Sequence, residues 1–187
     1  DYIHYLPGGL SSHKLGAAFE KKIVAQFSRS ILNKTDQVIV PTEKVEKILK
    51  KYEVEEPISV IPTGIDLKNF QNRMSKSECE NLKRNIPLEN KVLVSVGRLA
   101  KEKNLEEILN YFARLIYEEG KQNLTLLIVG DGPDRERLEE ISENLSLTGK
   151  VIFTGMVNPQ DVGIYYQLGD VFVCASNSET QGITYIE

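Results

Sequence analysis

The sequence predicts an α/β protein with parallel sheets, and three observations lead to this fold class. Short continuous apolar segments alternate with longer segments in which apolar residues recur every three or four positions. The first pattern is typical of strands buried on both faces, and the second of amphipathic helices. Residues 66 to 90 are polar, show neither pattern, and separate two regions that each contain the alternation. Strands and helices in alternation indicate doubly wound sheets, here in parts of two domains.

Each element of the first region has a local cause. Residues 14 to 34 carry apolar side chains at helical spacing, so we expect a helix there. Residues 36 to 41 and 57 to 62 are short apolar runs that end in proline, and we expect a buried strand at the first and a further strand at the second. Between these strands, Thr42 is a suitable N-cap for a second helix.

The second region repeats the alternation more regularly. Its apolar runs predict strands at residues 92 to 96, 124 to 129, 151 to 153 and 171 to 174. The segments between them predict helices at residues 105 to 116, 133 to 145 with Pro133 in the first turn, and 159 to 168.

Composition excludes several classes of protein. The 187 residues are 41% hydrophobic and 27% charged, which is ordinary for a soluble globular protein, and the net charge of −4 argues against nucleic-acid binding. The sequence contains no apolar run long enough for a transmembrane helix and no signal peptide, so we expect a cytoplasmic location. Cys79 and Cys174 lack metal-ligand spacing and are expected to be free thiols.

The candidate site residues lie in loops that follow the expected strands, where open α/β sheets bind ligands. Gly97 and Arg98 follow the strand at 92 to 96, and Lys103 stands near the start of the next helix. A guanidinium and an ammonium group at these places suit one diphosphate. Considered singly, they are explained more simply as surface cations.

Two further loops contain glycine. Gly130 and Gly132 could bring the backbone close to a phosphate, or could only form a tight turn. They complete neither the dinucleotide-binding fingerprint nor the P-loop motif. Val157 follows the strand at 151 to 153 and could pack against a base, although a plain turn is the simpler interpretation.

Glu179 lies in the last loop and Glu187 in the helix expected after it, eight positions further on, with Gly182 between them. A helix that begins here offers free backbone N–H groups to an anion, while the carboxylates suit hydroxyl groups. A nucleotide sugar combines both features. The alternative is a helix with ordinary surface glutamates.

Together these loops resemble a known family, the GT-B retaining glycosyltransferases of family 4, also called group 1. The resemblance covers nearly the whole chain and keeps the order and spacing of the motifs. The matching segments are IPTGID at 61–66, GRLAKEKN at 97–104, VGDGP at 129–133, FTG at 153–155, and the E-x7-E motif formed by Glu179 and Glu187.

The resemblance implies two Rossmann-like domains. Residues 1 to 62 would end the N-terminal acceptor-binding domain, residues 63 to 90 would cross between the domains, and residues 91 to 187 would begin the C-terminal nucleotide-sugar-binding domain. The first residue is not Met and the last lies in an expected helix, so we interpret the chain as part of a longer protein.

The resemblance also implies roles for individual residues. Arg98 and Lys103 would neutralise the donor diphosphate, Glu179 would contact hydroxyls of the transferred sugar, and Glu187 would bind the ribose. Transfer would retain the anomeric configuration, with no bound metal ion or other cofactor. The remaining donor-binding candidates are Gly97, Gly130, Gly132, Val157, Gln181, Gly182 and Ile183.

A narrower resemblance concerns the bacterial diacylglycerol glucosyltransferases, which use UDP-glucose. It rests on DYIHY at 1–5, the basic first helix, and SETQGITY at 178–185. A sugar or polysaccharide acceptor, or a non-catalytic nucleotide-sugar-binding protein, remains an alternative. The catalytic histidine of that subgroup would precede residue 1, so we expect the isolated chain to be inactive.

Residues 14 to 51 are a candidate surface for an anionic membrane. They contain nine Lys or Arg and four acidic residues, a net charge of +5 in a chain of −4. A basic helix with Phe19, Ile23 and Phe27 could lie on the inner face of the cell membrane as a peripheral contact. We favour the competing interpretation, in which these apolar residues face the core of the domain.

Overall fold

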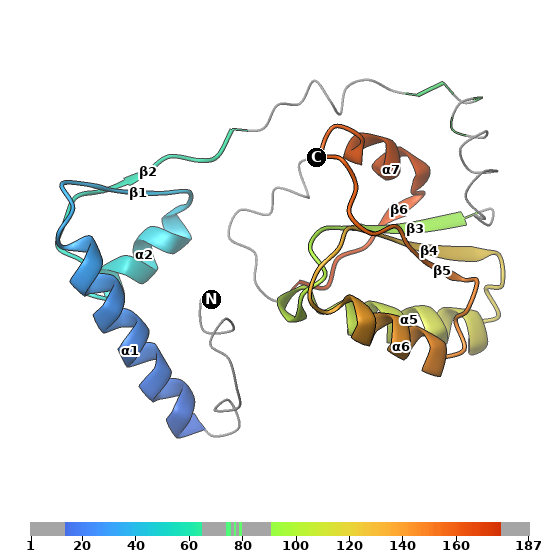
Figure 1. Ribbon diagram of the computed structural model, residues 1–187, viewed down its shortest axis with the longest axis horizontal. Helices are drawn as coiled ribbons and strands as arrows, with labels where there is room; N and C mark the ends of the chain where they lie inside the picture. The colour runs from blue at the N-terminus through green and yellow to red at the C-terminus, as the bar shows by residue number, and fades with distance from the viewer. Residues whose placement is uncertain (1–13, 65–73, 76, 78, 80–90, 177–187) are drawn as a thin grey trace. The chain divides into compact units, whose positions relative to one another are not determined.

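The structure, a computed structural model, describes residues 14–64, 74, 75, 77, 79 and 91–176 (Figure 1). These residues belong to two compact units, the first within residues 14–64 and the second formed by the remainder. Each unit has a parallel sheet of its own.

The first unit has two parallel strands in which Val38 lies opposite Ile58. Thr42 begins the helix between them, as the sequence predicts, because its backbone is extended and its Oγ1 accepts a hydrogen bond from the Val45 amide at 3.4 Å. The elements are α1 (Lys14–Leu32), β1 (Val38–Val40), α2 (Glu43–Lys51) and β2 (Ile58–Val60).

Strand β1 is buried on one face only. Val38 and Val40 are buried together with Val54, and Leu49 of α2 packs against them. Ile39 points to the opposite face and is 64% exposed. The prediction of a fully buried strand is therefore wrong for β1. Side chains alternate between the faces of a strand, and among the described residues helices pack on only one of these faces.

Helix α1 also differs from the expectation. Ile23, Phe27 and Ile31 recur at intervals of four residues and are 48%, 66% and 47% exposed. Leu32 lies on another side of the helix and packs against the core of the first unit. The interpretation that the apolar residues face a core is wrong for these three, which we call the α1 stripe, within the described part of the chain.

The second unit has four strands in the order β5-β4-β3-β6, all parallel. A short 3₁₀ turn, η2, precedes the first helix of this unit. The elements are β3 (Lys91–Val96), η2 (Lys101–Lys103), α5 (Leu105–Tyr117), β4 (Leu124–Val129), α6 (Arg135–Asn144), β5 (Val151–Phe153), α7 (Val162–Leu168) and β6 (Val171–Phe172).

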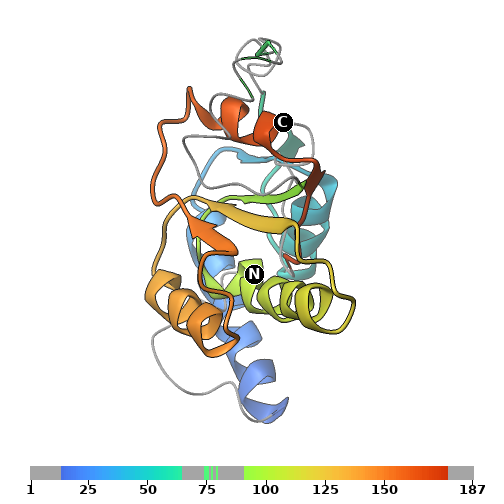
Figure 2. The same ribbon diagram turned by 90° about the vertical axis from the view of Figure 1, so that its right-hand side faces the viewer.

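Helices cover both faces of this second sheet. Leu126 and Ile128 of β4 pack with residues of α5 and α6, while Leu127 and Val129 pack on the other face with Leu168 of α7. Figures 1 and 2 show α5 and α6 on one side of the sheet and α7 on the other. The doubly wound arrangement predicted from the continuous apolar runs is confirmed for this unit.

In the second unit, three element boundaries differ from the prediction by two or more residues. Pro133 precedes α6, because the Arg135 amide donates to the Gly132 carbonyl and closes a turn with proline at its second position. Helix α7 begins at Val162, after a turn in which the Asp161 amide donates to the carbonyl of Asn158. Strand β6 ends at Phe172.

Within the described ranges, none of the helices combines the length and apolar character needed to cross a bilayer.

Candidate functional site

A cavity of about 570 Å³ lies at the carboxyl edge of the second sheet, where the loops after β3, β4 and β5 meet. Parallel strands bring their carboxyl ends to one edge, so residues far apart in the sequence become neighbours there. The lining residues are Val96, Gly97, Arg98, Val129, Gly130, Asp131, Gly132, Met156, Val157 and Val162.

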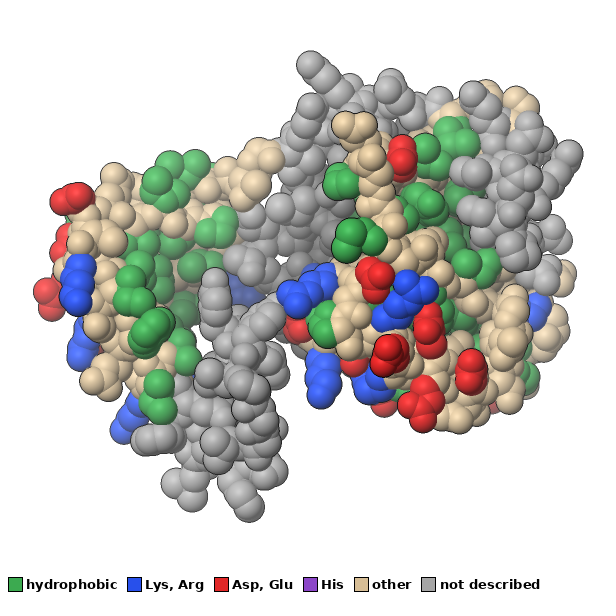
Figure 3. All heavy atoms as spheres, viewed as in Figure 1, with side chains coloured by type: hydrophobic (Ala, Val, Ile, Leu, Met, Phe, Trp, Pro, Cys, Tyr) green, Lys and Arg blue, Asp and Glu red, His purple; other side chains and the backbone are tan. Residues whose placement is uncertain are grey.

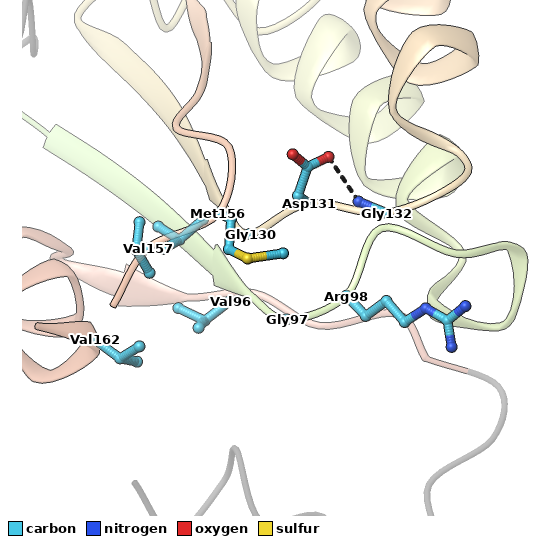
Figure 4. A pocket seen from close by; sticks show the side chains of 10 residues that line it. Val96, Gly97, Arg98, Gly130, Asp131, Gly132, Met156, Val157 and Val162 are labelled. Carbon is cyan, nitrogen blue, oxygen red and sulfur yellow. Dashed lines mark hydrogen bonds between the residues drawn. The ribbon is translucent and has the colours of Figure 1, made fainter. Parts of the chain in front are cut away.

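The cavity has an apolar side and a polar side. Figure 4 shows the side chains of Val96, Val157 and Val162 grouped on one side, with Arg98 extending away from them. Asp131 turns its carboxylate toward the amide of Gly132 (Figure 4), and the hydrogen bond measures 2.8 Å. A flat apolar group and an anionic group can therefore occupy neighbouring parts of the same cavity.

Five of the predicted donor-site residues line this cavity, and each comes from a loop that the sequence singled out. Arg98 is exposed to solvent at the cavity wall. The sequence reasoning missed the parts played by Asp131, Met156 and Val162; their position directly after or near a strand end was the available signal. The five are Gly97, Arg98, Gly130, Gly132 and Val157.

The backbone on both sides of Arg98 is held by the loop after β4. The Gly97 amide donates to the carbonyl of Val129 at 2.9 Å, and the Leu99 amide donates to the carbonyl of Asp131 at 3.0 Å. The carbonyl of Leu99 accepts from the Asp134 amide, and the Leu99 side chain is buried at 1% exposure. The β3–β4 pairing thus continues past the ends of the strands and positions Arg98.

Gly130 and Gly132 are required by this close pairing. A Cβ atom on Gly130 would lie 2.0 Å from the carbonyl oxygen of Gly97, and one on Gly132 would lie 2.3 Å from that of Leu99. Gly130 also has a φ of 129°, a conformation that residues with a side chain rarely adopt. Close packing against the loop after β3 therefore explains the two glycines, in addition to the donor-binding role that the sequence predicts for them.

Lys103 lies in η2, in the same connection between β3 and α5 as Arg98. Its amide donates to the carbonyl of Ala100 at 2.9 Å, and the turn ends at Asn104, whose φ is 52°. The hydroxyl of Ser176 donates to the carbonyl of Glu102 at 3.3 Å and joins this turn to the chain after β6. Lys103 is half-buried and is not among the residues that line the cavity.

An ion-pair group stands behind the loop after β4. Arg135 donates from Nε to Glu139 at 2.8 Å and from Nη1 to Asp131 at 3.3 Å. The hydrogen bond to Glu139 raises the pKa of Arg135, against a smaller lowering by burial, and Asp131 raises it further. The guanidinium is therefore a permanent charge next to the cavity.

The remaining predicted site residues lie outside the described part of the chain. They are Glu179, Gln181, Gly182, Ile183 and Glu187.

Family profiles match both regions of the chain. The profile described as "Glycosyl transferases group 1" matches residues 78–187, and the profile described as "Glycosyltransferase Family 4" matches residues 2–69.

Two curated relatives align with the whole chain. An alpha-monoglucosyldiacylglycerol synthase of Streptococcus pneumoniae is 37% identical, and the alignment covers 100% of this chain and 41% of the relative. An enzyme of the same name from Acholeplasma laidlawii is 32% identical over 100% of this chain and 47% of its own length. The chain thus spans less than half the length of the curated relatives it matches.

The fold is that of the GT-B glycosyltransferases. The crystal structure of Anabaena HepE in complex with UDP and glucose superposes with a TM-score of 0.70 at 17% identity, over 89% of this chain and 44% of HepE. At this identity the superposition supports the fold alone, while the profile over residues 78–187 and the 37% identity over the whole chain establish the family. The chain belongs to the group 1 glycosyltransferases.

Proposed function

We propose that the full-length protein transfers glucose from UDP-glucose to diacylglycerol, with retention of the anomeric configuration. The observation that carries this proposal is the cavity at the sheet edge, which combines apolar walls with Arg98. The names of the two curated relatives support the glucose and diacylglycerol parts, and the UDP and glucose bound to HepE support the donor.

The donor chemistry follows from charge. A departing UDP gains negative charge as its bond to the sugar breaks, and a fixed cation beside the diphosphate stabilises that charge. Arg98 is suited to this role because its backbone is held on both sides and its side chain reaches solvent at the cavity. We assign Lys103 the same role from the other end of the β3–α5 connection.

The uracil is assigned to the apolar side of the cavity, against Val157 and near Val96. In the part outside the described residues, Glu179 is assigned to the hydroxyls of glucose and Glu187 to the ribose. Gly182 and Ile183 would contribute backbone groups, and Gln181 would stand between them and Glu179.

The two units receive separate tasks in this proposal. Residues 1 to 62 belong to the acceptor-binding domain, residues 63 to 90 cross to the second domain, and residues 91 to 187 begin the nucleotide-sugar-binding domain. The isolated chain would then bind donor without completing transfer.

We further propose that the first unit contacts the inner face of the cell membrane, where diacylglycerol resides. The α1 stripe is exposed, and Lys21, Lys22 and Arg29 on the same helix are exposed as well. Figure 3 shows hydrophobic side chains gathered on the visible face of this unit, with Lys and Arg as well as Asp and Glu side chains along its edge. Apolar residues beside cations are the combination that binds an anionic bilayer surface.

The proposed reaction is tested by measuring UDP release from UDP-glucose by the full-length protein, with and without diacylglycerol in mixed micelles. We expect release that depends on diacylglycerol, and a loss of roughly a hundredfold or more in Arg98→Met and Glu179→Gln. Lys101→Gln is the matched control, because Lys101 is an exposed cation of the same connection and does not line the cavity.

Other outcomes separate the alternatives. Release with a sugar or polysaccharide acceptor alone would keep the glycosyltransferase and reject the lipid acceptor. No release with any donor or acceptor would favour a nucleotide-sugar-binding protein without catalytic activity. Sedimentation with anionic vesicles tests the membrane contact. Phe27→Ser should reduce binding to the vesicles. Equal binding by the variant would indicate that protein, and not the membrane, covers the α1 stripe.

A further inference from the structure

We propose that Arg135 is a positioning residue for the nucleotide: it joins the loop after β4 to the loop after β5 and so sets the width of the cavity between them. The inference rests on the proposed function in one respect, since the occupant of the cavity is taken to be a uridine nucleotide. Arg135 itself is not among the lining residues and acts through residues that are.

The first connection is to the loop after β4. Arg135 Nη1 donates to Asp131 Oδ2 at 3.3 Å, while the other oxygen of Asp131 accepts from the Gly132 amide at 2.8 Å. Both carboxylate oxygens of Asp131 are therefore engaged within the loop and the start of α6. Because Asp131 lines the cavity, its position sets one wall.

The second connection is to the loop after β5. A Cβ atom built on Gly155 would lie 2.8 Å from Arg135 Nη1, so a side chain at this position would require the guanidinium to shift. Gly155 has a φ of 73°, which also favours glycine. The next two residues, Met156 and Val157, line the cavity, so the contact with Arg135 is adjacent to the second wall.

Contacts of the backbone between the same two loops are few, and they lie just past the ends of the strands. Gly130 and Gly155 form an isolated antiparallel bridge, and the Gly130 amide reaches the hydroxyl of Thr154 at 3.3 Å. Within residues 91–176, no backbone hydrogen bond joins Met156 or Val157 to the loop after β4. The guanidinium thus reinforces the contact between the two loops at the point where the hydrogen-bond ladder of the sheet ends.

Arginine is the residue type that this junction needs. Arg135 uses Nε for Glu139 and Nη1 for Asp131, so the planar group is fixed from two directions, and Nη1 lies close to Gly155. Lysine offers a single ammonium group and cannot hold both carboxylates in this geometry. We therefore expect Arg135→Lys to keep the positive charge but to hold the loop after β5 in position only in part.

The test uses the full-length protein and the variants Arg135→Met and Arg135→Lys. The matched control is Arg114→Met, because Arg114 forms the same kind of i,i+4 ion pair with Glu118 on the surface of α5. Amide hydrogen exchange is measured for the peptide covering residues 151 to 158. UDP affinity is measured by calorimetry, and kcat is measured under saturating donor.

In Arg135→Met we expect exchange in the 151–158 peptide to be faster by roughly fivefold or more, because opening of the loop becomes easier. UDP should bind about tenfold more weakly, with kcat within about twofold, because the lost interaction supports binding in the ground state and the transition state alike. The exchange rate and the UDP affinity of Arg135→Lys should lie between those of Arg135→Met and of the unaltered protein. Both values for Arg114→Met should match those of the unaltered protein.

Unchanged exchange in Arg135→Met would overturn the inference whatever the enzyme transfers. Faster exchange with unchanged UDP affinity would overturn the positioning role and leave a structural contact only. If the protein uses another donor or no donor, the proposed function fails in the release assay, while the exchange measurement still decides whether Arg135 holds the loop.

Discussion

The two units share the same alternation of apolar strands and amphipathic helices, but they bury their apolar residues to different extents. Strand β4 is buried from Thr125 to Val129, and helices cover both faces of its sheet. Strand β1 buries Val38 and Val40 and leaves Ile39 64% exposed. Both strands are apolar runs of β-branched and aliphatic residues. Their burial is therefore decided by what packs on the second face, which is a property of the tertiary structure.

The same difference distinguishes the surfaces of the two units. The second unit buries a core on both faces of its sheet, and its loops at the sheet edge carry Arg98 and the cavity walls. The first unit, in its described part, exposes the α1 stripe and Ile39 together. Such apolar surface is suited to contact with another surface, either protein or membrane.

The largest effect is expected from opening the core of the second unit. Phe112 of α5 is 1% exposed, and Phe112→Ala should lower the free energy of unfolding by about 3–5 kcal/mol through lost burial and a residual cavity. Phe27→Ala is the matched control in the first unit, because Phe27 is 66% exposed and should change stability by less than about 0.5 kcal/mol. Denaturant titration measures both. A similar loss in the two variants would show that Phe27 is buried in solution and would remove the contrast between the units.

The next effect concerns the loops that hold Arg98. Gly132→Ala places a Cβ atom 2.3 Å from the carbonyl oxygen of Leu99 and should destabilise the protein by about 1–3 kcal/mol. Catalysis should fall more than stability predicts, because the backbone beside Arg98 must shift. Gly64→Ala is the stability control, since no atom lies within 4 Å of its added Cβ. Full activity in Gly132→Ala would mean that the clamp around Arg98 is dispensable.

A smaller effect is expected at the start of α6. Arg137 holds Asp134 through two hydrogen bonds of 2.7 and 2.8 Å, and both Asp134 and Glu106 raise the pKa of Arg137. The Asp134 side chain is only 7% exposed, so Arg137→Met leaves a nearly buried carboxylate without this partner. We expect a loss of about 1–2 kcal/mol, at the low end for a buried charged group because Arg137 itself is 40% exposed. Thermal unfolding measures this loss, and Arg114→Met should change the midpoint far less.

The smallest effect tests a local signal in the first unit. Thr42→Ala removes the side-chain oxygen that caps α2 and should cost about 1 kcal/mol, whereas Thr42→Ser keeps the cap. Unfolding followed by circular dichroism compares the two variants. Equal stability would indicate that packing of α2 on β1, rather than its cap, determines where the helix begins.

Much of the site was predictable because loops after parallel strands share one edge. Gly97, Arg98, Gly130, Gly132 and Val157 follow three different strands and line one cavity, as the apolar runs implied. Arg135 was not predictable in this way. It lies on a helix with the spacing of an ordinary surface ion pair, and only the path of the β5 loop places Gly155 against it.

The amino-acid sequence was sufficient for the alternation of strands and helices, the Thr42 cap, and the order of the loops that carry the site, because these depend on interactions between near neighbours in the chain. Tertiary structure alone decided that Ile39 and the α1 stripe stay exposed and that Gly130 and Gly132 leave the space of a side chain to a neighbouring loop. Those outcomes depend on contacts between segments distant in sequence, and the periodicity of one segment contains no information about its partner.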